Sequence, residues 1–191
     1  MTETKASLYV ISGPSGVGKG TVCKALLSRD DSLAYSVSAT TRQRRPDEID
    51  GVHYHFLTKE DFMARVERGE FLEWANVYEN CYGTLKSFVL EQLASGKDVV
   101  LEIDTNGALQ VKKLMPEAVL VFLAPPSAEE LLSRLQGRET ETAEEIAKRQ
   151  KCLEFELSQQ VFYDYTVVND EVERAVDEIR QIIARRHAGQ K

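Results

Sequence analysis

A glycine-rich loop near the start of the chain constrains its fold more than any other feature. Residues 12–19 read Ser-Gly-Pro-Ser-Gly-Val-Gly-Lys, and they directly follow the apolar residues 8–11. A buried strand, a glycine loop that ends in lysine and a following helix form the P-loop, which binds nucleotide phosphates. The glycines let successive backbone N–H groups point at phosphate oxygens, beside the positive end of the helix dipole. The sequence therefore predicts an α/β fold with a phosphate-binding loop formed by Gly13, Pro14, Ser15, Gly16, Val17, Gly18, Lys19, Gly20 and Thr21.

The residue after Lys19 departs from the usual P-loop. A Ser or Thr hydroxyl normally contacts Mg²⁺ at this place, but this chain has Gly20, followed by Thr21. A Lys-Gly-Thr ending resembles that of adenylate kinases. Because Mg²⁺ gives up its water reluctantly, we expect it to be bound together with ATP, by phosphate oxygens and water. We predict no direct metal ligand in the chain.

Composition and charge exclude several classes of protein. The chain has 191 residues, of which 42% are hydrophobic and 29% charged, and this fits one domain. No apolar run approaches the roughly 20 residues that span a bilayer. The net charge of -7 argues against nonspecific nucleic-acid binding. Residues 1–7 are polar and leave no room for a secretory signal, and three widely spaced cysteines fit a reducing compartment. The sequence thus predicts a cytoplasmic protein with no membrane span.

Short β-branched runs alternate with amphipathic segments along most of the chain. This alternation predicts a doubly wound parallel sheet flanked by helices. The predicted strands are residues 8–11, 99–103, 119–123 and 165–168. The predicted helices are residues 18–29, 84–95, 107–114, 127–135, 142–160 and 171–186, and capping boxes open the fourth at Ser127 and the fifth at Thr142.

Residues 35–82 break this rhythm. Short polar and aromatic strands are predicted there at residues 36–38, 52–56 and 71–74, with one helix at 59–68. Such a segment is typical of a small lobe inserted into the main domain. Residues 136–142 contain no apolar side chain and are expected to form an exposed connection.

Six separated motifs in this framework closely resemble those of guanylate kinases, over about residues 8–183. Besides the P-loop, they are Ser-Ala-Thr-Thr-Arg-Gln-Arg-Arg at 38–45, Glu-Trp-Ala at 73–75, Tyr-Gly-Thr at 82–84, Ile-Asp at 103–104 and Ala-Pro-Pro-Ser at 124–127. The resemblance implies a nucleoside monophosphate kinase fold and phosphoryl transfer from MgATP to GMP or dGMP. It also implies one domain, 1–191, divided into a core (5–34, 85–126 and 161–187), a GMP-binding lobe (35–84) and a helical lid (127–160).

The resemblance assigns a GMP site to the lobe and to the strand that ends near Asp104. Arginine forks suit the oxygens of a phosphate, so Arg42 and Arg45 are expected to bind the GMP phosphate. Guanine presents donors at N1 and N2 beside an acceptor at O6, which calls for a carboxylate together with a hydroxyl. The family positions for GMP are Ser38, Arg42, Arg45, Glu48, Tyr54, Glu73, Tyr82, Thr84, Glu102 and Asp104.

The ATP side is assigned in the same way. Asn169 matches a position near the adenine, and Asp104 stands where many P-loop proteins hold Mg²⁺ through water. The residues implied in catalysis are Lys19, Arg42, Arg134, Arg138 and Arg149. The attacking phosphate of GMP is already ionised near neutral pH, because its second pKa is about 6. No catalytic base is therefore expected.

Two other functions are considered. Guanylate-kinase-like domains that have lost catalysis serve as binding modules, but those usually carry a damaged P-loop, and this chain keeps Lys19 and its glycines. Kinases of phosphorylated sugars share the P-loop but should lack the guanine-reading residues Ser38, Glu73 and Thr84. ATP and GMP are the expected partners, and the sequence leaves open whether the chain is a monomer or a homo-oligomer.

Overall fold

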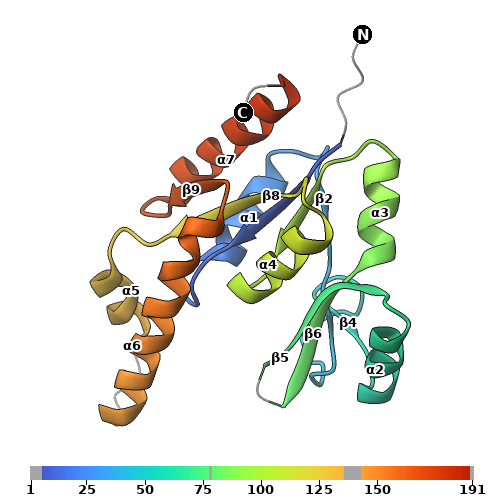
Figure 1. Cartoon of the computed structure of the whole chain (residues 1–191), viewed down its shortest axis with the longest axis horizontal. Coiled ribbons are helices and arrows are strands. Elements are labelled where there is room, and N and C mark those ends of the chain that lie inside the picture. The colour runs from blue at the N-terminus through green and yellow to red at the C-terminus, as the bar shows by residue number, and fades with distance from the viewer. Residues whose placement is uncertain (1–5, 78, 136–142, 190–191) are drawn as a thin grey trace.

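The computed structural model describes residues 6–77, 79–135 and 143–189, with side chains described outside 133–150. Five parallel strands form the large sheet in the order β2-β7-β1-β8-β9 (Figure 1). The strands are β1 (Leu8–Ser12), β2 (Ala34–Tyr35), β7 (Val99–Glu102), β8 (Val119–Ala124) and β9 (Tyr165–Val168). The four predicted strands and the parallel sheet are confirmed, whereas β2 was not predicted.

The central strand β1 separates two hydrophobic cores. Tyr9 and Ile11 face the core shared with α1 (Lys19–Ser28) and α7 (Val172–His187). Leu8 and Val10 face the core shared with α3 (Lys86–Ala94) and α4 (Thr105–Leu114). Successive side chains of a strand point to opposite faces, and helices cover both faces here. For that reason β1 reads as a continuous apolar run.

The small lobe consists of a mixed four-stranded sheet and one helix. Its strand order is β4-β3-β6-β5, and β3 pairs in parallel with β4 but antiparallel with β6. The rings of Phe62 and Phe71 stack at 4.4 Å between centroids and join the helix to the sheet. The elements are β3 (Ala39–Thr40), β4 (His55–Phe56), α2 (Lys59–Glu67), β5 (Phe71–Val77) and β6 (Asn80–Leu85).

The sequence-based boundaries need correction in this lobe. Residues 36–38 were predicted as a strand, but the strand begins at Ala39. Thr84 was predicted to open a helix, but it lies in β6, paired with Glu73 of β5. In the segment 80–85, Tyr82 and Thr84 favour a strand but Asn80 and Gly83 disfavour it, so the local signal is mixed. Pairing with β5 supplies the order that local sequence lacks.

Two further helices stand at the other side of the molecule. They are α5 (Ala128–Leu135) and α6 (Ala143–Ser158), and a 3₁₀ turn, η1 (Gln159–Phe162), follows α6. The N–H of Glu130 donates to Ser127 Oγ at 3.1 Å, so the predicted cap of α5 is present. The second predicted capping residue, Thr142, and the connection 136–142 lie outside the described residues. Figure 1 shows α5 and α6 at the lower left and the small lobe at the lower right.

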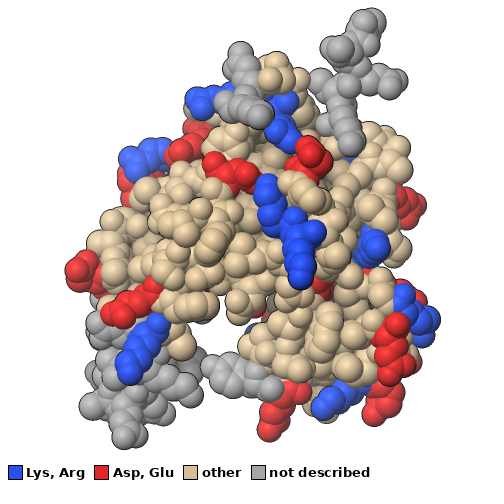
Figure 2. All heavy atoms as spheres, viewed as in Figure 1, with Lys and Arg blue, Asp and Glu red and all other residues tan. Residues whose placement is uncertain are grey.

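Positive and negative side chains are interspersed over the face of the molecule shown in Figure 2. The same view shows an opening below the core, between the part that contains α5 and α6 and the small lobe. Within the described residues, no helix combines the length and apolar character needed to cross a membrane.

Gly13 follows β1 and lies against the neighbouring strand β8. Its φ is +148°, and a Cβ at this position would overlap the carbonyl oxygen of Leu123. Gly96 also has a positive φ, +84°, but nothing lies within 4 Å of its Cβ position. We expect Gly13→Ala to lower the free energy of unfolding by about 3 kcal/mol or more, from backbone strain plus overlap.

Gly96→Ala is the matched control, because it adds the same methyl group at a positive φ in open space. It should cost only about 1 kcal/mol. Urea denaturation of both variants measures the difference. Equal losses would show that the contact between Gly13 and β8 does not constrain the fold.

Candidate active site

Several of the predicted site residues lie together at the carboxyl edge of the large sheet, where open parallel sheets bind their ligands. The P-loop leaves the end of β1, and Glu102 and Asp104 leave the end of the adjacent strand β7. The small lobe brings β5 and β6 over the same edge. Residues from Lys19 to Asp104 thus meet in one hollow of about 340 Å³, lined by Lys19, Ser38, Tyr54, Glu73, Ala75, Val77, Tyr82, Gly83, Glu102, Ile103 and Asp104.

The P-loop is held by its own lysine and by an asparagine from the end of the sheet. Lys19 Nζ donates to the carbonyl oxygens of Gly13 at 2.7 Å and Pro14 at 3.1 Å. Asn169, which directly follows β9, is buried and donates from Nδ2 to the carbonyl oxygen of Val17 at 2.8 Å. Asn169 therefore stabilises the loop through this hydrogen bond. Its Oδ1 is buried with no hydrogen-bond partner.

Burial lowers the pKa of the Lys19 ammonium from its ordinary value, while the nearby carboxylates of Glu156, Glu102 and Asp104 act in the opposite direction. Nucleotide phosphates would replace loop carbonyls as acceptors for this ammonium and would add further negative charge next to it. Lys19 is therefore placed to contact a phosphate bound in the loop.

Glu73 is the most deeply placed acid in the hollow. Its side chain is only 6% exposed, and Thr84 Oγ1 donates to its Oε1 at 2.6 Å. Burial and, to a smaller extent, the negative charge of Asp104 raise the pKa of the Glu73 carboxyl to about 7, against the hydrogen bonds from Thr84. The predicted pairing of a carboxylate with a hydroxyl is thus present as a hydrogen-bonded unit.

A glycine in α4 makes room for this carboxyl group. A Cβ on Gly107 would lie 2.9 Å from Glu73 Oε2, which is too close for an unmoved carboxylate. The Gly107 N–H also donates to Asp104 Oδ1 at 2.8 Å, so Asp104 caps the helix. Sequence reasoning did not assign Gly107 a role. The predicted helix began at Gly107, whereas α4 begins at Thr105 and includes this glycine in its first turn.

The two predicted phosphate-binding arginines differ in their surroundings. Arg42 Nη2 lies 2.6 Å from Glu48 Oε1, and its guanidinium lies over the Tyr54 ring at 5.5 Å. Glu48 Oε2 accepts the backbone N–H of Arg45 at 2.8 Å, while the Arg45 side chain is exposed. The contact with Arg42 raises the arginine's pKa and lowers that of Glu48. Glu48 therefore touches the arginine loop, and it does not line the hollow.

The aromatic residues near Arg42 form the wall of the hollow. The rings of Tyr54 and Tyr82 meet edge to face at 6.0 Å between centroids. Both residues line the hollow, as Ser38 does from the loop before β3. A phosphate placed beside Arg42 would therefore find tyrosine hydroxyls close by.

Glu102 is positioned by two residues that the sequence analysis did not connect with it. Tyr35, at the end of β2, donates from its hydroxyl to Glu102 Oε2 at 3.2 Å. A Cβ on Gly20 would lie 3.3 Å from Glu102 Oε1, so the missing P-loop side chain leaves space for this carboxylate. Burial, and then Glu102, raise the pKa of Tyr35 and keep it a neutral donor. A pairing between distant segments leaves no local signal in sequence.

The predicted lid arginines fall partly outside the described residues. Arg134 and Arg149 belong to α5 and α6, but their side chains are not described. Arg138 lies in the segment 136–142, outside the described residues. An acidic residue of α6, Glu156, reaches the P-loop. Its Oε2 accepts a hydrogen bond from the Ser15 N–H at 3.3 Å. No sequence signal distinguished Glu156 from the other acidic residues of this helix.

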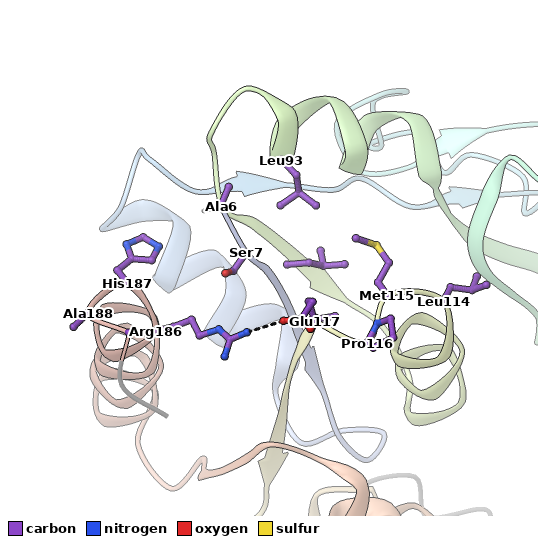
Figure 3. Close-up of a pocket in the computed structure, with 13 residues that line it drawn as sticks. Ala6, Ser7, Leu93, Leu114, Met115, Pro116, Glu117, Arg186, His187 and Ala188 are labelled. Atoms are coloured by element: carbon purple, nitrogen blue, oxygen red, sulfur yellow. Dashed lines mark hydrogen bonds and ion pairs between the residues drawn. The ribbon is translucent and has the colours of Figure 1, made fainter. Parts of the chain in front are cut away.

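A larger hollow, of about 680 Å³, lies at the opposite edge of the sheet (Figure 3). Leu93, Leu114 and Met115 give it an apolar lining, and Arg186 faces Glu117 across its rim at 3.5 Å. It opens where β1 and β8 begin, and none of the predicted site residues that the structure describes lines it. Since parallel sheets bind ligands at the carboxyl ends of their strands, we take the smaller hollow at the P-loop as the candidate active site.

Comparison with known proteins gives the family of this chain. The guanylate kinase family profile matches residues 5–186. A guanylate kinase from Caldanaerobacter subterraneus subsp. tengcongensis is 54% identical over 176 residues, which are 92% of this chain and 85% of that protein. A guanylate kinase from Halalkalibacterium halodurans is 51% identical over 187 residues, which are 98% of this chain and 92% of that protein.

Solved structures show the same relationship. The crystal structure of guanylate kinase from Anaplasma phagocytophilum aligns with a TM-score of 0.78 at 33% identity, covering 96% of this chain and 87% of that one. Shikimate kinase from Bacteroides thetaiotaomicron aligns with a TM-score of 0.54 at 20% identity, over 93% of this chain and 98% of that one, so it shares the fold alone. The resemblance inferred from the motifs is therefore confirmed: this chain belongs to the guanylate kinase family.

Proposed function

We propose that this protein transfers the terminal phosphoryl group of MgATP to GMP, and to dGMP, giving ADP and GDP or dGDP. The observation that carries the proposal is Glu73, which lines the same hollow as Lys19 and accepts a hydrogen bond from Thr84. This arrangement supports a guanine reader directly beside a phosphate-binding loop. Membership in the guanylate kinase family supports the same reaction.

The buried carboxylate accounts for the choice of base. When ionised, Glu73 accepts hydrogen bonds, and guanine offers adjacent N–H donors at N1 and N2. Adenine has an unprotonated N1 and would leave the buried carboxylate facing an acceptor, which costs more than one lost hydrogen bond. We assign Ser38 and Glu102, which line the same hollow, to the remaining polar edge of the base.

The phosphate of GMP is assigned to the wall on the lobe side. Arg42, Tyr54 and Tyr82 provide a guanidinium and two hydroxyls there, and Arg45 can approach from the exposed loop. Glu48 is assigned an indirect part, because it orients Arg42 and the backbone of Arg45. GMP phosphate oxygens would compete with Glu48 for the Arg42 guanidinium.

Transfer then depends on position and charge. A GMP phosphate oxygen is ionised at neutral pH and attacks the terminal phosphorus of ATP in line, so the chain needs no general base. Lys19 and the P-loop amides would neutralise charge on the phosphoryl group, together with Arg134, Arg138 and Arg149 from the lid region. Asn169 is assigned to the adenine side of ATP. Exclusion of water prevents transfer to water.

The residues present fit Mg²⁺ bound mainly through phosphates and water. The P-loop lacks its usual hydroxyl at Gly20, and no cluster of three or more His, Cys, Asp or Glu suited to a metal occurs in the part of the chain that the structure describes. The carboxylates of Glu102 and Asp104, at the end of β7, can hold coordinated water. When bound, Mg²⁺ neutralises phosphate charge.

The division of the chain follows from these roles. We assign GMP binding to the lobe 35–84, the P-loop scaffold to the core 5–34, 85–126 and 161–187, and lid function to 127–160. We place the protein in the cytoplasm, where both nucleotides occur. The free thiols of Cys23, Cys81 and Cys152 support this location.

The proposed function is tested by offering acceptors one at a time. MgATP is combined with GMP, dGMP, AMP, UMP, CMP, dTMP or a ribose phosphate, and ADP formation is measured against a control without acceptor. We expect turnover with GMP and dGMP far above the other acceptors. Turnover with a sugar phosphate alone would indicate a sugar-phosphate kinase. Absence of turnover with every acceptor would indicate a noncatalytic binding module.

Glu73→Gln should raise KM for GMP by about 100-fold, because the amide presents a donor where guanine also donates.

The same substitution should change how stability depends on pH. The pKa of Glu73 is about 7 in the folded protein against 4.5 ordinarily, so as pH rises the unfolded chain loses its proton first. The contribution of Glu73 to stability is thus present below pH 4.5 and is lost as pH rises through about 7.

We therefore expect the free energy of unfolding of Glu73→Gln, taken relative to that of wild type, to rise by about 2 kcal/mol from pH 5 to pH 8. Urea denaturation at both pH values measures this gain. Parallel curves of unfolding free energy against pH for the two proteins would show that folding does not raise the pKa of Glu73.

Gly107→Ala should separate GMP recognition from stability. Alanine favours a helix over glycine by about 1 kcal/mol, but its methyl group would displace the Glu73 carboxylate. We expect a fold of at least wild-type stability, with KM for GMP raised about tenfold and KM for ATP unchanged. Steady-state kinetics and thermal unfolding test this together. An unchanged KM for GMP would show that the position of the Glu73 carboxylate is not critical.

A further inference from the structure

The carboxylate of Glu156 contacts the phosphate-binding loop. It projects from α6, and its Oε2 accepts a hydrogen bond from the backbone N–H of Ser15 at 3.3 Å. Ser15 lies in the middle of the 13–19 loop, whose N–H groups suit the oxygens of an anion. A carboxylate offers the same kind of acceptor as a phosphate. In this structure, therefore, the loop already binds an anionic group of the chain itself.

The groups around Glu156 explain why its charge is tolerated there. The Ser15 N–H and the Lys19 ammonium favour its ionised form, whereas partial burial and the negative charge of Asp104 oppose it, and burial is the largest influence, raising its pKa. Lys19 meanwhile donates to the loop carbonyls of Gly13 and Pro14. The two groups that stabilise the Glu156 charge are thus groups that a nucleotide phosphate needs.

Space is available for the carboxylate to leave the loop. Glu156 also lines a hollow of about 390 Å³ between α6 and the start of α4, together with Asp104, Thr105, Asn106, Lys151, Cys152 and Phe155. A rotation of its side chain away from Ser15 can move the carboxylate into this hollow. Release of the loop therefore does not require α6 to unfold.

We propose that Glu156 is an internal competitor for the phosphate site and thereby a determinant of ATP affinity. The inference rests on the proposed role of the loop in binding ATP. Two anions cannot share the Ser15 N–H without strong repulsion, so the triphosphate displaces the carboxylate and takes over both Ser15 and Lys19. Part of the binding energy of the triphosphate is then used to break this contact. Since Glu156 belongs to α6, binding of phosphates to the loop also removes a contact between that helix and the P-loop.

Substitution of Glu156 tests the inference by a gain of affinity. Glu156→Gln keeps the shape and an acceptor oxygen but removes the charge, and Glu156→Ala removes both. Glu178→Gln removes one charge from an exposed position on α7 and serves as the matched control. Isothermal titration with ATP and Mg²⁺, without an acceptor, should show ATP binding about tenfold tighter to Glu156→Gln than to wild type or the control.

Two ligands separate this effect from a general change in the protein. Tripolyphosphate carries the phosphates without base or ribose, and it should gain affinity for Glu156→Gln as ATP does. GMP is assigned to the other side of the hollow, and its affinity should stay at the wild-type value. Thermal unfolding of the variants should stay close to wild type, because the contact is exposed and neither Ser15 nor Glu156 belongs to a hydrophobic core.

The outcomes distinguish the inference from the proposed function. ATP binding to wild type with equal or weaker binding to Glu156→Gln would overturn the competitor role and leave the kinase assignment intact. An equal gain for GMP would also overturn it, since the effect would then not depend on the P-loop. Failure of wild type to bind ATP or tripolyphosphate would overturn the assignment of the loop, and the inference with it.

Discussion

The double-sided burial of β1 is the constraint on which the candidate site depends. This strand pairs with β7 on one edge and β8 on the other, and its side chains enter both hydrophobic cores. Gly13 then lies directly against the backbone of β8, which sets the direction in which the P-loop leaves the sheet. Because β7 lies beside β1 in parallel, Glu102 emerges next to Lys19. A change in strand register would move the loop and the acids apart.

The site also contains features that oppose folding. Glu73 is a buried carboxyl group with a raised pKa, and its ionised form is costly until a ligand supplies donors. Gly107 gives up helix propensity so that this carboxyl group can approach α4. Glu156 and Lys19 form hydrogen bonds with the phosphate loop through groups of the chain itself. In each case a recognition group is kept in a position that stability alone would not favour.

Much of the fold could be predicted because its signals are local. The strands at β1, β7, β8 and β9 are short, apolar and bounded by helical patterns, and each appears where it was expected. The strands β2 and β6 were not recognised. Two residues of β2 are too few to show a period, and β6 contains Gly83 and polar residues that gain order by pairing with β5. Their pairing partners lie at other places in the chain, which a local pattern does not reveal.

The sequence by itself determined the phosphate loop, the α/β class and the family resemblance, and it pointed to several of the polar residues that line the hollow. These depend on spacing within short segments, where glycine conformation, side-chain periodicity and motif order act directly. Only the tertiary structure decided that Tyr35 holds Glu102, that Gly107 makes room for Glu73 and that Glu156 occupies the P-loop. Those contacts join residues up to 141 positions apart. They exist because strand order and helix packing bring distant segments together, and no local propensity encodes that proximity.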